Sequence, residues 1–520
     1  MLIFQYIFGD LTMFIRHTCS DSDQICLANI VQFVAFLVAG WFFVLAPVDV
    51  TFATPVQSDN QVGIKNGSFK NWKEGLPVGW EVGIGADNGG SSPLSKVQKG
   101  AAPSLVLSGD ASTMAWRMVK QELKLTPGTT YRLSYSAKAN NLKREGSQFD
   151  NCYVGIFLTE KTGAFRVKEV WPVTEPEFTT KSSIMRGQKD VGKLELGIFL
   201  SKSGQLTVKD FKLEALKPAD SFDLLVKDMA RKYSFFRLKN IDWAALSAKY
   251  KERAEAAKTP DEFATVVGEM LDELKDIHTW AEFRGKRYSN FSSGFDANYD
   301  FNIVKSNLKS IDQIGKFGIV GMTKSGFCYV NIQTLAGVSN ADIREMTDQI
   351  IKNNKAPGFI VDLRRNSGGA ENPAKLIAGL FTRKEIVFAK SLVRKGDNPD
   401  DFSEPNDRTI WKTRNVVYDG PIIALSGPGA VSSAEAMVMM FKSLPNCTVI
   451  GKTTRGASGN PASILLPNGV DVYYSRWQSL ETDGTCIEGV GVKPNIEVEH
   501  EKGSDKTYTK AVEMLLKKTK

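Results

Sequence analysis

The stretch 421–444, PIIALSGPGAVSSAEAMVMMFKSL, constrains the fold of this chain more than any other. Its apolar start, residues 421–425, predicts a buried strand, and the Gly/Pro-rich residues 426–430 predict a tight turn. Apolar residues at helical spacing follow, and Ser432 lies at the junction. A serine on such a turn can direct its hydroxyl into a cleft beside the free N–H groups of the helix start, which is the geometry of a nucleophile.

Ser432 and Glu435 also fit a simpler, structural role. A serine followed three residues later by a glutamate, just before an apolar run, is the pattern of a capping box that holds a helix N-terminus. Such boxes are common at helix starts, so this pattern taken alone favours capping over catalysis. Residues elsewhere in the chain must decide between the two roles.

Length and composition limit the function further. The 520 residues, 42% of them hydrophobic, are enough for two to four domains, and the net charge of +8 is spread without a basic block. We therefore expect no nucleic-acid partner. The six cysteines lack C-x-x-C spacing and the histidines are only His17, His278 and His500, so we expect no metal and no cofactor. A bridge between Cys447 and Cys486 stays open for an oxidising compartment.

Residues 1–56 predict export. The segment 28–46 is uncharged and apolar over nearly the length of a membrane span, and small and polar residues follow it. We interpret it as a signal peptide cleaved near Ala53 or as an uncleaved signal anchor, although Arg16 is the only strongly basic residue before it. A buried core helix is the alternative. In either export case the rest of the chain works in the periplasm, at the cell surface or as a secreted protein.

Residues 58–216 predict an all-β sandwich. Short alternating segments are separated by turn clusters, as expected of antiparallel sheets. The opening segment 64–82, with its N-G-x-F and G-L-P-x-G-W patterns, resembles the start of jelly-roll carbohydrate-binding modules. A glycan partner for this domain therefore stays open, but packing is the favoured role of its tryptophans, because aromatic residues usually contribute buried area first. These are Trp72, Trp80, Trp116 and Trp171.

Residues 217–285 predict a small helical subdomain that ends at a histidine. Three segments have helical periodicity, and Thr259 followed by Pro260 marks a helix start. The last helix leads directly into the sequence DIHT, which contains His278. A helix C-terminus favours the imidazolium form, which suits a base that becomes charged during a reaction. A lone histidine is otherwise more often structural.

Residues 286–505 predict an α/β domain, because strand-type and helix-type segments alternate along them. The loop 366–369, NSGG, places two glycines where backbone amides can approach a substrate. Asn468 and Gly469 suit the turn of a hairpin. Residues 506–520 are expected to form a helical tail.

Five motifs in this order resemble the C-terminal processing peptidase family, also called the tail-specific proteases. They are LDELKDIHT, DLRRNSGG, GPGAVSSAEAMVMMFKSLPNCTVIGKTTRG, LPNGVDVYYSRW and DGTCIEGVGVKPNIEV. The first is similar to the branch of the family near the tricorn protease core. The resemblance covers roughly residues 222–498, and it implies a crotonase-like α/β core and a serine peptidase acting on proteins or peptides.

The resemblance assigns the family's nucleophile to Ser432. Bacterial processing proteases pair this serine with a lysine, but Ala457 occupies the lysine position here. Tricorn-like members use a histidine base oriented by a glutamate instead, and His278 and Glu488 stand at the matching positions. Nucleophile, base and orienting acid thus occur as a set, which favours the catalytic role of Ser432 over capping.

The remaining site residues come from the two turns. We expect the N–H groups of Gly368 and Ser433 to bind the oxyanion, and Gly369 and Gly429 to line the substrate, with no metal. The segment between His278 and residue 327 is too short for the PDZ domain with which many family members capture C-terminal tails. Selectivity for C-termini is therefore not implied.

Two other functions stay possible on the same scaffold. A catalytically decayed core could bind peptides while the sandwich binds glycans, although the intact set of Ser432, His278 and Glu488 argues against decay. The site could also hydrolyse a non-peptide ester or amide. The sequence predicts neither the oligomeric state nor the cleavage preference.

Overall fold

A computed structural model describes most of the chain after residue 62. The described residues are 63–83, 95–109, 116–142, 152–161, 165–189, 192–201, 204–289, 291–414 and 418–519. The signal peptide or anchor predicted for residues 1–56 lies outside them. None of the helices in the described ranges is both long and apolar enough to cross a membrane.

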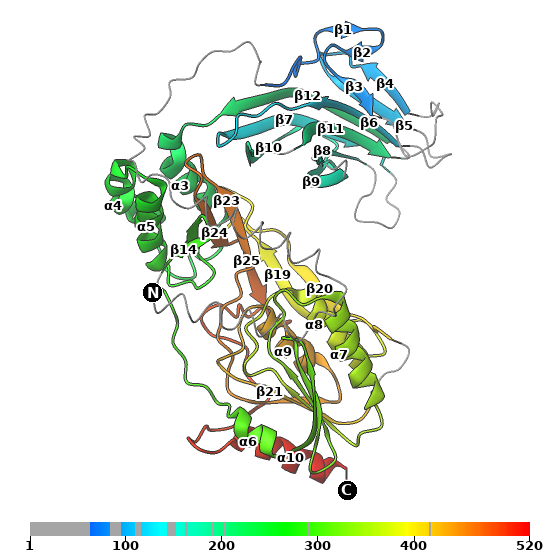
Figure 1. Cartoon of the computed structure of the whole chain (residues 1–520), viewed down its shortest axis with the longest axis vertical. Coiled ribbons are helices and arrows are strands. Elements are labelled where there is room, and N and C mark those ends of the chain that lie inside the picture. The colour runs from blue at the N-terminus through cyan, green and yellow to red at the C-terminus, as the bar shows by residue number, and fades with distance from the viewer. Residues whose placement is uncertain are drawn as a thin grey trace, which may run out of the picture. The chain divides into compact units, whose positions relative to one another are not determined.

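Two five-stranded antiparallel sheets make up the N-terminal domain (Figure 1). One has the strand order β10-β7-β12-β5-β4 and the other β3-β6-β11-β8-β9, and β1 and β2 form a separate pair. The strands are β1 Trp72–Lys73, β2 Leu76–Pro77, β3 Glu81–Gly83, β4 Ser95–Lys99, β5 Leu105–Gly109, β6 Trp116–Glu122, β7 Thr130–Asn140, β8 Cys152–Thr159, β9 Phe165–Pro172, β10 Thr179–Arg186, β11 Lys193–Ser201 and β12 Gly204–Ala215.

These two sheets enclose one hydrophobic core. Alternate residues of β7 are buried, as expected of a strand with one face against a core. Leu133 of β7 and Val154 of β8 belong to different sheets but to the same buried cluster. The two-layer antiparallel arrangement predicted for residues 58–216 is therefore present, while its jelly-roll description and its glycan partner stay predictions.

Trp80 packs inside this domain, as expected. Only 6% of its surface is exposed, and its ring lies 5.2 Å from that of Phe69 and 5.7 Å from that of Phe211, between ring centroids. Its indole N–H donates to the carbonyl of Lys65 at 3.0 Å. Both the apolar ring and the polar N–H are thus satisfied by packing, so Trp80 is not part of an exposed sugar platform.

Three α-helices follow the sandwich: α3 Ser221–Lys232, α4 Trp243–Ala256 and α5 Pro260–Asp272, after a short 3-10 helix η1, Pro218–Asp220. The predicted start of α5 is confirmed, because the Thr259 side chain accepts a hydrogen bond from the N–H of Glu262. The buried residues of these helices share one cluster with Val472 and Tyr474, which lie far along the chain. The helical segment therefore shares its core with the C-terminal part.

Two small antiparallel sheets connect the helices to the C-terminal region. The first has the order β14-β13-β24-β23, so the strand that follows His278 pairs with the predicted hairpin at Asn468 and Gly469. The second has the order β20-β19-β25. Their bounds are β13 Trp280–Phe283, β14 Lys286–Tyr288, β19 Ile386–Val393, β20 Asn406–Ile410, β23 Pro461–Leu465, β24 Asp471–Ser475 and β25 Trp477–Leu480.

A seven-stranded sheet of order β15-β16-β17-β18-β21-β22-β26 is the centre of the C-terminal region. Strands β17, β18, β21, β22 and β26 run parallel, whereas β15 and β16 are antiparallel additions at one edge. The strands are β15 Leu308–Ile314, β16 Gly318–Thr323, β17 Cys328–Ile332, β18 Phe359–Asp362, β21 Ile422–Ser426, β22 Cys447–Gly451 and β26 Ile496–Glu497. The strand-and-helix alternation predicted for residues 286–505 builds this sheet.

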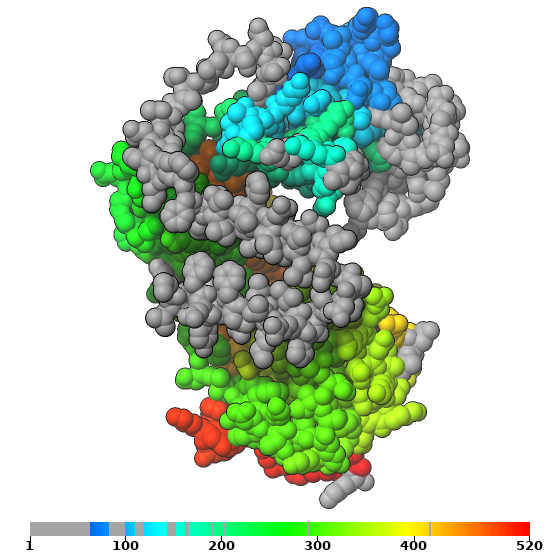
Figure 2. Space-filling view, viewed as in Figure 1, coloured from blue at the N-terminus to red at the C-terminus, as the bar shows by residue number. Residues whose placement is uncertain are grey.

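Helices cover both faces of the sheet, because its strands are apolar on both sides. Ile422 and Ala424 of β21 pack against one layer, and Ile423 and Leu425 pack against the other. The first layer holds α7 Asn340–Lys352, α8 Glu371–Ala378, η2 Gly379–Phe381 and α9 Ser433–Ser443, and the second holds α6 Phe301–Ser306 and α10 Lys506–Lys518. On the molecular surface, green residues near α6 adjoin the red C-terminal segment (Figure 2).

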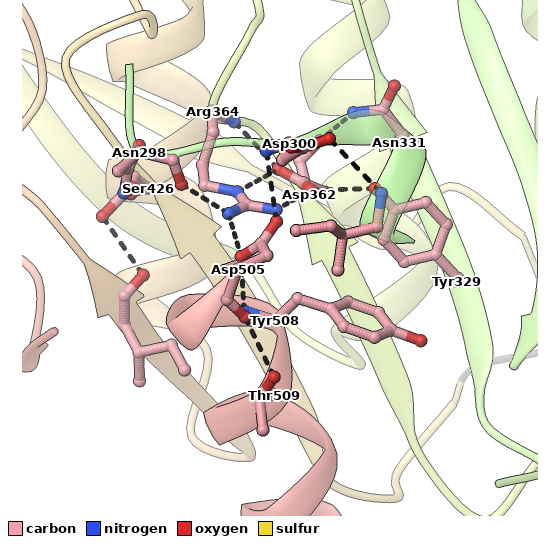
Figure 3. A network of polar contacts seen from close by, with 12 residues as sticks. Asn298, Asp300, Tyr329, Asn331, Asp362, Arg364, Ser426, Asp505, Tyr508 and Thr509 are labelled. Carbon is pink, nitrogen blue, oxygen red and sulfur yellow. Dashed lines mark hydrogen bonds and ion pairs between the residues drawn. The ribbon is translucent and has the colours of Figure 1, made fainter. Parts of the chain in front are cut away.

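Arg364 anchors the C-terminal helix to this sheet (Figure 3). Its buried guanidinium donates to both carboxylate oxygens of Asp362, at 2.9 and 2.6 Å, and to Oδ1 of Asp505 at 2.7 Å. Asp505 also caps α10, since it accepts from the N–H of Tyr508. Removing one partner of a buried ion pair costs about 3–5 kcal/mol, so this network holds α10 in place.

The structure also decides the cysteine question that the sequence left open. Cys447 at the start of β22 and Cys486 in a later loop are both free thiols. Burial raises the pKa of Cys447 to about 12 and that of Cys486 to about 11. Both thiols therefore stay protonated near neutral pH, and no bridge joins them.

Candidate active site

Ser432 lies on the turn that joins β21 to α9. Its backbone has φ 61° and ψ −127°, a region that residues other than glycine rarely occupy and that costs about 1–3 kcal/mol. Ser432 is the N-cap residue, and Glu435 accepts its N–H as in the predicted capping box, but the N–H of Glu435 donates to the backbone carbonyl of Ser432 at 2.9 Å and not to its hydroxyl. The turn thus holds a strained serine whose hydroxyl is not used by the capping role.

Glu435 holds this turn in place. Its carboxylate is fully buried and accepts hydrogen bonds from the N–H groups of Ser432 at 3.1 Å, Gly456 at 2.7 Å and Ala457 at 2.9 Å, and from the hydroxyl of Thr454 at 2.6 Å. Burial raises the pKa of Glu435 to about 7, against these hydrogen bonds, which favour the ionised form. The glutamate is therefore more than a helix cap, because it ties α9 to the loop after β22.

The loop after β22 completes the support of the serine. Ala457, at the position of the family's lysine, accepts the N–H of Ser432 with its carbonyl at 3.0 Å. Lys452 lies elsewhere, in ion pairs with Glu499 at 2.7 Å and Glu497 at 3.6 Å. A lysine base is thus absent from the position that the Ser-Lys dyad requires.

The NSGG loop comes close to the serine from the other side. A Cβ on Gly368, where φ is +77°, would lie 2.5 Å from the carbonyl oxygen of Val431 and 2.9 Å from Cβ of Ser432, so only glycine fits there. The N–H of Gly368 donates to Oδ1 of Asn366 at 2.9 Å. The predicted oxyanion donor is therefore already engaged in this structure.

Two other N–H groups are available beside Ser432. Those of Gly369 and Ser433 have no acceptor within the described part of the chain, and the Ser433 hydroxyl donates to the carbonyl of Gly369 at 2.6 Å. Gly369, which we expected only to line the substrate, is thus better placed than Gly368 to donate. The bond between the Ser433 hydroxyl and Gly369 fixes the two segments to each other.

A cavity of about 200 Å³ opens at this point. It is lined by Ser432, Ser433, Gly369 and Ser458, among others. Gly429, the second expected substrate residue, lines a neighbouring cavity of about 720 Å³. The structure therefore brings most of the predicted serine-side residues to one cavity and leaves Gly429 at the next.

His278 follows α5 in a tight turn built by Asp276. The buried Asp276 carboxylate accepts from the backbone N–H of His278 at 2.8 Å, the hydroxyl of Ser475 at 2.7 Å and that of Tyr233 at 3.1 Å. Thr279 returns a hydrogen bond from its hydroxyl to the Asp276 carbonyl at 2.8 Å. The role of Asp276 was missed at the sequence level, although its place in the motif DIHT was the available signal.

The imidazole of His278 is electrostatically suited to act as a base. Burial lowers its pKa below the ordinary 6.5; the negative charge of Asp276 opposes this, and the charges of Arg287 and Lys239 lower it further. The ring is therefore neutral near pH 7. Its Nδ1 is buried and has no hydrogen-bond partner, and no bond joins the ring to Ser432 or Glu488 among the described residues.

Glu488 is buried, although it lies in a loop. Only 5% of its surface is exposed, and its carboxylate pairs with Lys239 at 2.9 Å and accepts the N–H of Ser458 at 3.0 Å. Burial raises the pKa of Glu488 and the charge of Asp276 adds to this, while Lys239 lowers it. Because Ser458 follows Ala457, which bonds Ser432, Glu488 and Ser432 are attached to successive residues of one loop.

Comparison with known proteins identifies the region that carries this geometry. Residues 326–498 match the model of peptidase family S41, and residues 215–272 match the Tricorn protease C1 domain. Residues 326–498 are a peptidase family S41 domain. The resemblance to the processing peptidases and to the tricorn branch is confirmed.

Similar proteins support the same family. The chain is 26% identical over 167 residues to carboxy-terminal processing protease CtpA of Bacillus subtilis, covering 32% of this chain and 34% of that protein. It is 22% identical over 255 residues to CtpB of the same organism, covering 48% and 51%. A crystal structure named "putative peptidase" from Parabacteroides merdae is 26% identical with a TM-score of 0.51, covering 58% and 97%. The chain thus spans about a third to a half of the curated relatives.

Only part of the candidate site lies within the residues that match the S41 model. Ser432, Gly369 and Glu488 lie within residues 326–498, whereas His278 lies between the two matched segments. The nucleophile side therefore has direct family support. The candidate base, His278, comes just before β13, which pairs with β24.

Proposed function

We propose that this protein is a serine peptidase that hydrolyses peptide bonds through an acyl-enzyme on Ser432. The observation that carries the proposal is the strained turn at Ser432, whose hydroxyl is free of the helix cap and opens into a cavity beside two N–H groups without acceptors. The S41 match over residues 326–498 supports the same chemistry. His278 is the proposed base and Glu488 the acid that orients it.

The proposed reaction has two halves, the acylation of Ser432 and the hydrolysis of the acyl-enzyme. Neutral His278 takes the proton of Ser432, and the alkoxide attacks the peptide carbonyl. The N–H groups of Ser433 and Gly369, or of Gly368 if it leaves Asn366, stabilise the oxyanion, each by about 3–4 kcal/mol in comparable sites. The imidazolium, held by the charge of Glu488, gives its proton to the leaving amine, and water then hydrolyses the acyl-enzyme.

Catalysis requires the histidine to approach the serine. A general base acts within about 2.6–3.2 Å of the proton donor, and such contacts often tighten only when substrate binds. The ring of His278 has no partner on Nδ1, so no bond to Nδ1 opposes its reorientation. The carboxylate of Glu488, which pairs with Lys239, keeps acceptor sites for the ring.

The protein's surroundings are part of the proposal. The apolar segment 28–46, followed by small and polar residues, supports export to the periplasm, the cell surface or the medium, by cleavage or as an anchor. The pattern in residues 64–82 supports a jelly-roll type for the sandwich and leaves a glycan as its ligand class. The crotonase-like description of the core rests on the family resemblance.

A second candidate function is peptide binding by a decayed site. The missing hydrogen bond between His278 and Ser432 is the observation that favours it. The intact residues and the buried position of Glu488 favour catalysis instead. One labelling experiment separates these two functions.

The purified protein is incubated with a fluorophosphonate, and the modified serine is mapped by mass spectrometry. We expect modification at Ser432, loss of modification in Ser432→Ala, and full modification in Ser443→Ala, a matched control near the other end of α9. A folded protein without modification would contradict catalysis and favour the decayed site. Comparing casein with small esters then distinguishes a peptidase from an esterase.

A further inference from the structure

We propose that the cavity beside Ser432 is a side-chain pocket that selects a short residue carrying a hydrogen-bond acceptor, such as Asn or Asp. The selected residue is the one whose carbonyl Ser432 attacks. The inference rests on the proposed function and adds its substrate class. Arg408 of β20, which also lines the cavity, is the residue that sets the selection.

The cavity combines the reaction centre with a separate set of lining residues. Ser432, Ser433 and Gly369 belong to the reaction centre, whereas Arg408 of β20 and Trp477 and Ser479 of β25 come from the three-stranded sheet. A carbonyl oxygen held by the N–H groups of Ser433 and Gly369 places the neighbouring Cα at the same cavity. Its volume of about 200 Å³ is below that of ordinary ligand sites and suits one side chain.

Helix α9 contributes the wall next to the serine. Ala436 lies in the first turn of α9, and it lines the cavity together with Ser432. The small side chain of Ala436 leaves the space open, and Pro461 adds a second apolar wall. A longer residue at 436 would narrow the cavity.

Arg408 supplies the recognition group. Only 8% of its surface is exposed, and its guanidinium lies over the rings of Phe388 and Trp477, at 5.2 and 4.8 Å from their centroids. One terminal nitrogen donates to the hydroxyl of Ser479 at 2.6 Å and the other to the carboxylate of Glu371. Its Nε is buried without a hydrogen-bond partner in the described structure. Arg408 lines the cavity, so an acceptor oxygen that enters it meets a positively charged side chain that carries guanidinium N–H donors.

The charges around Arg408 decide whether the pocket favours an acidic or a basic substrate side chain. Among the described residues that line the cavity, only Glu371 is acidic, and its carboxylate is already paired with Arg408 and with Lys375 at 3.1 Å. Together, Arg408, Lys375 and Glu371 carry a net charge of +1. A Lys or Arg side chain of the substrate would therefore meet a cation and no free carboxylate, whereas an amide or carboxylate oxygen would meet a donor.

Matched peptides test the pocket in the wild-type protein. A peptide that the protein cleaves is made with Asn, Asp, Leu or Lys at the residue before the scissile bond, and kcat/KM is measured for each. We expect Asn and Asp to exceed Leu, which has similar size but no acceptor, by about 10- to 100-fold. Lys should be the poorest. A preference for Leu, Lys or an aromatic residue overturns the proposal, and the Asn and Asp peptides separate amide from carboxylate recognition.

Two variants test the residue. Arg408→Lys keeps a cation beside Glu371 but removes the planar guanidinium and its N–H donors, so the preference for Asn over Leu should fall below about threefold. Arg383→Lys, an exposed arginine paired with Asp419, is the matched control and should leave the preference unchanged. An unchanged preference in a folded Arg408→Lys overturns the proposal.

Ala436→Val keeps the test decisive if Arg408→Lys fails to fold. The added methyl groups narrow the cavity, so cleavage after Asn should fall about tenfold more than cleavage after Gly, and equal losses overturn the proposal. Fluorophosphonate modification of Ser432 is measured in every variant. Intact modification with the wrong selectivity overturns the pocket alone, whereas a wild-type protein that is neither modified nor active overturns the proposed function as well.

Discussion

The serine side and the histidine side of the candidate site are held in different ways. The serine side comprises Ser432 and the loop 454–457, whose backbone and side-chain groups converge on the buried carboxylate of Glu435. The histidine side comprises His278, Glu488 and Lys239, where the backbone turn is fixed but the imidazole has no hydrogen bond on Nδ1.

This difference locates the adjustable part of the site. The serine side is assembled at the ends of β21 and β22, which are neighbours in one parallel sheet, so sheet hydrogen bonds fix its geometry. The histidine side is assembled from three segments far apart in the chain. We infer that the nucleophile is preorganised and that completion of the site depends on the ring of His278 and the carboxylate of Glu488.

Removing the base gives the largest expected effect. In His278→Ala no group takes the proton of Ser432, so kcat should fall about 10⁴- to 10⁶-fold. Peptide hydrolysis and fluorophosphonate modification are measured together with a thermal unfolding curve. His500→Ala, which alters an exposed histidine, should retain full activity. Robust turnover by His278→Ala would sink the histidine-base assignment.

Neutralising the orienting acid gives the next largest effect. Glu488→Gln keeps the size of the side chain but removes the charge that stabilises the imidazolium, so kcat should fall about 10²- to 10⁴-fold. Glu499→Gln, at an exposed glutamate, is the matched control and should change kcat by less than about twofold. If the kcat of Glu488→Gln also falls by less than about threefold, Glu488 does not orient the base.

Glu435→Gln tests the rigidity of the serine side through its pH dependence. Burial raises the pKa of Glu435 from 4.5 to about 7, so the folded protein binds this proton more tightly than the unfolded chain. The group therefore stabilises the fold at low pH, and that contribution is lost as pH rises from about 4.5 to about 7, by about 3 kcal/mol.

Urea unfolding of wild type and Glu435→Gln at pH 4.5, 6 and 7.5 measures this contribution. The free energy of unfolding of the wild type should decrease relative to that of the variant as pH rises, because glutamine does not titrate. A difference between the two proteins that is constant with pH would mean that the pKa of Glu435 is the same in the folded and unfolded states, so that its four hydrogen bonds offset the effect of burial.

Lys239→Met should give the smallest effect, confined to the pH profile. The charge of Lys239 lowers the pKa of His278, so its removal should raise that pKa and move the acidic limb of kcat/KM to higher pH. The plateau at alkaline pH should change by less than about threefold. Lys452→Met, at a lysine paired with Glu499, should leave the profile unaltered, and a shift of the limb to lower pH in Lys239→Met would contradict the assignment.

The sequence by itself determined the local units of the fold. Strand β21, the turn and α9 follow from apolar spacing around Gly and Pro residues, and the start of α5 follows from Thr259 and Pro260. The hairpin at Asn468 and Gly469 also follows from its turn residues. These features are encoded by neighbouring residues, because periodicity, capping and turn chemistry act over a few positions.

Only the tertiary structure decided how those units meet. The pairing of β13 with β24 places the turn of His278, the burial of Glu488 follows from Lys239 and Ser458, and the N–H of Gly368 is engaged by Asn366. Arg408 gained its position beside Ser432 in the same way. Contacts between residues far apart in the chain depend on how sheets pair and pack, and no local pattern records that choice.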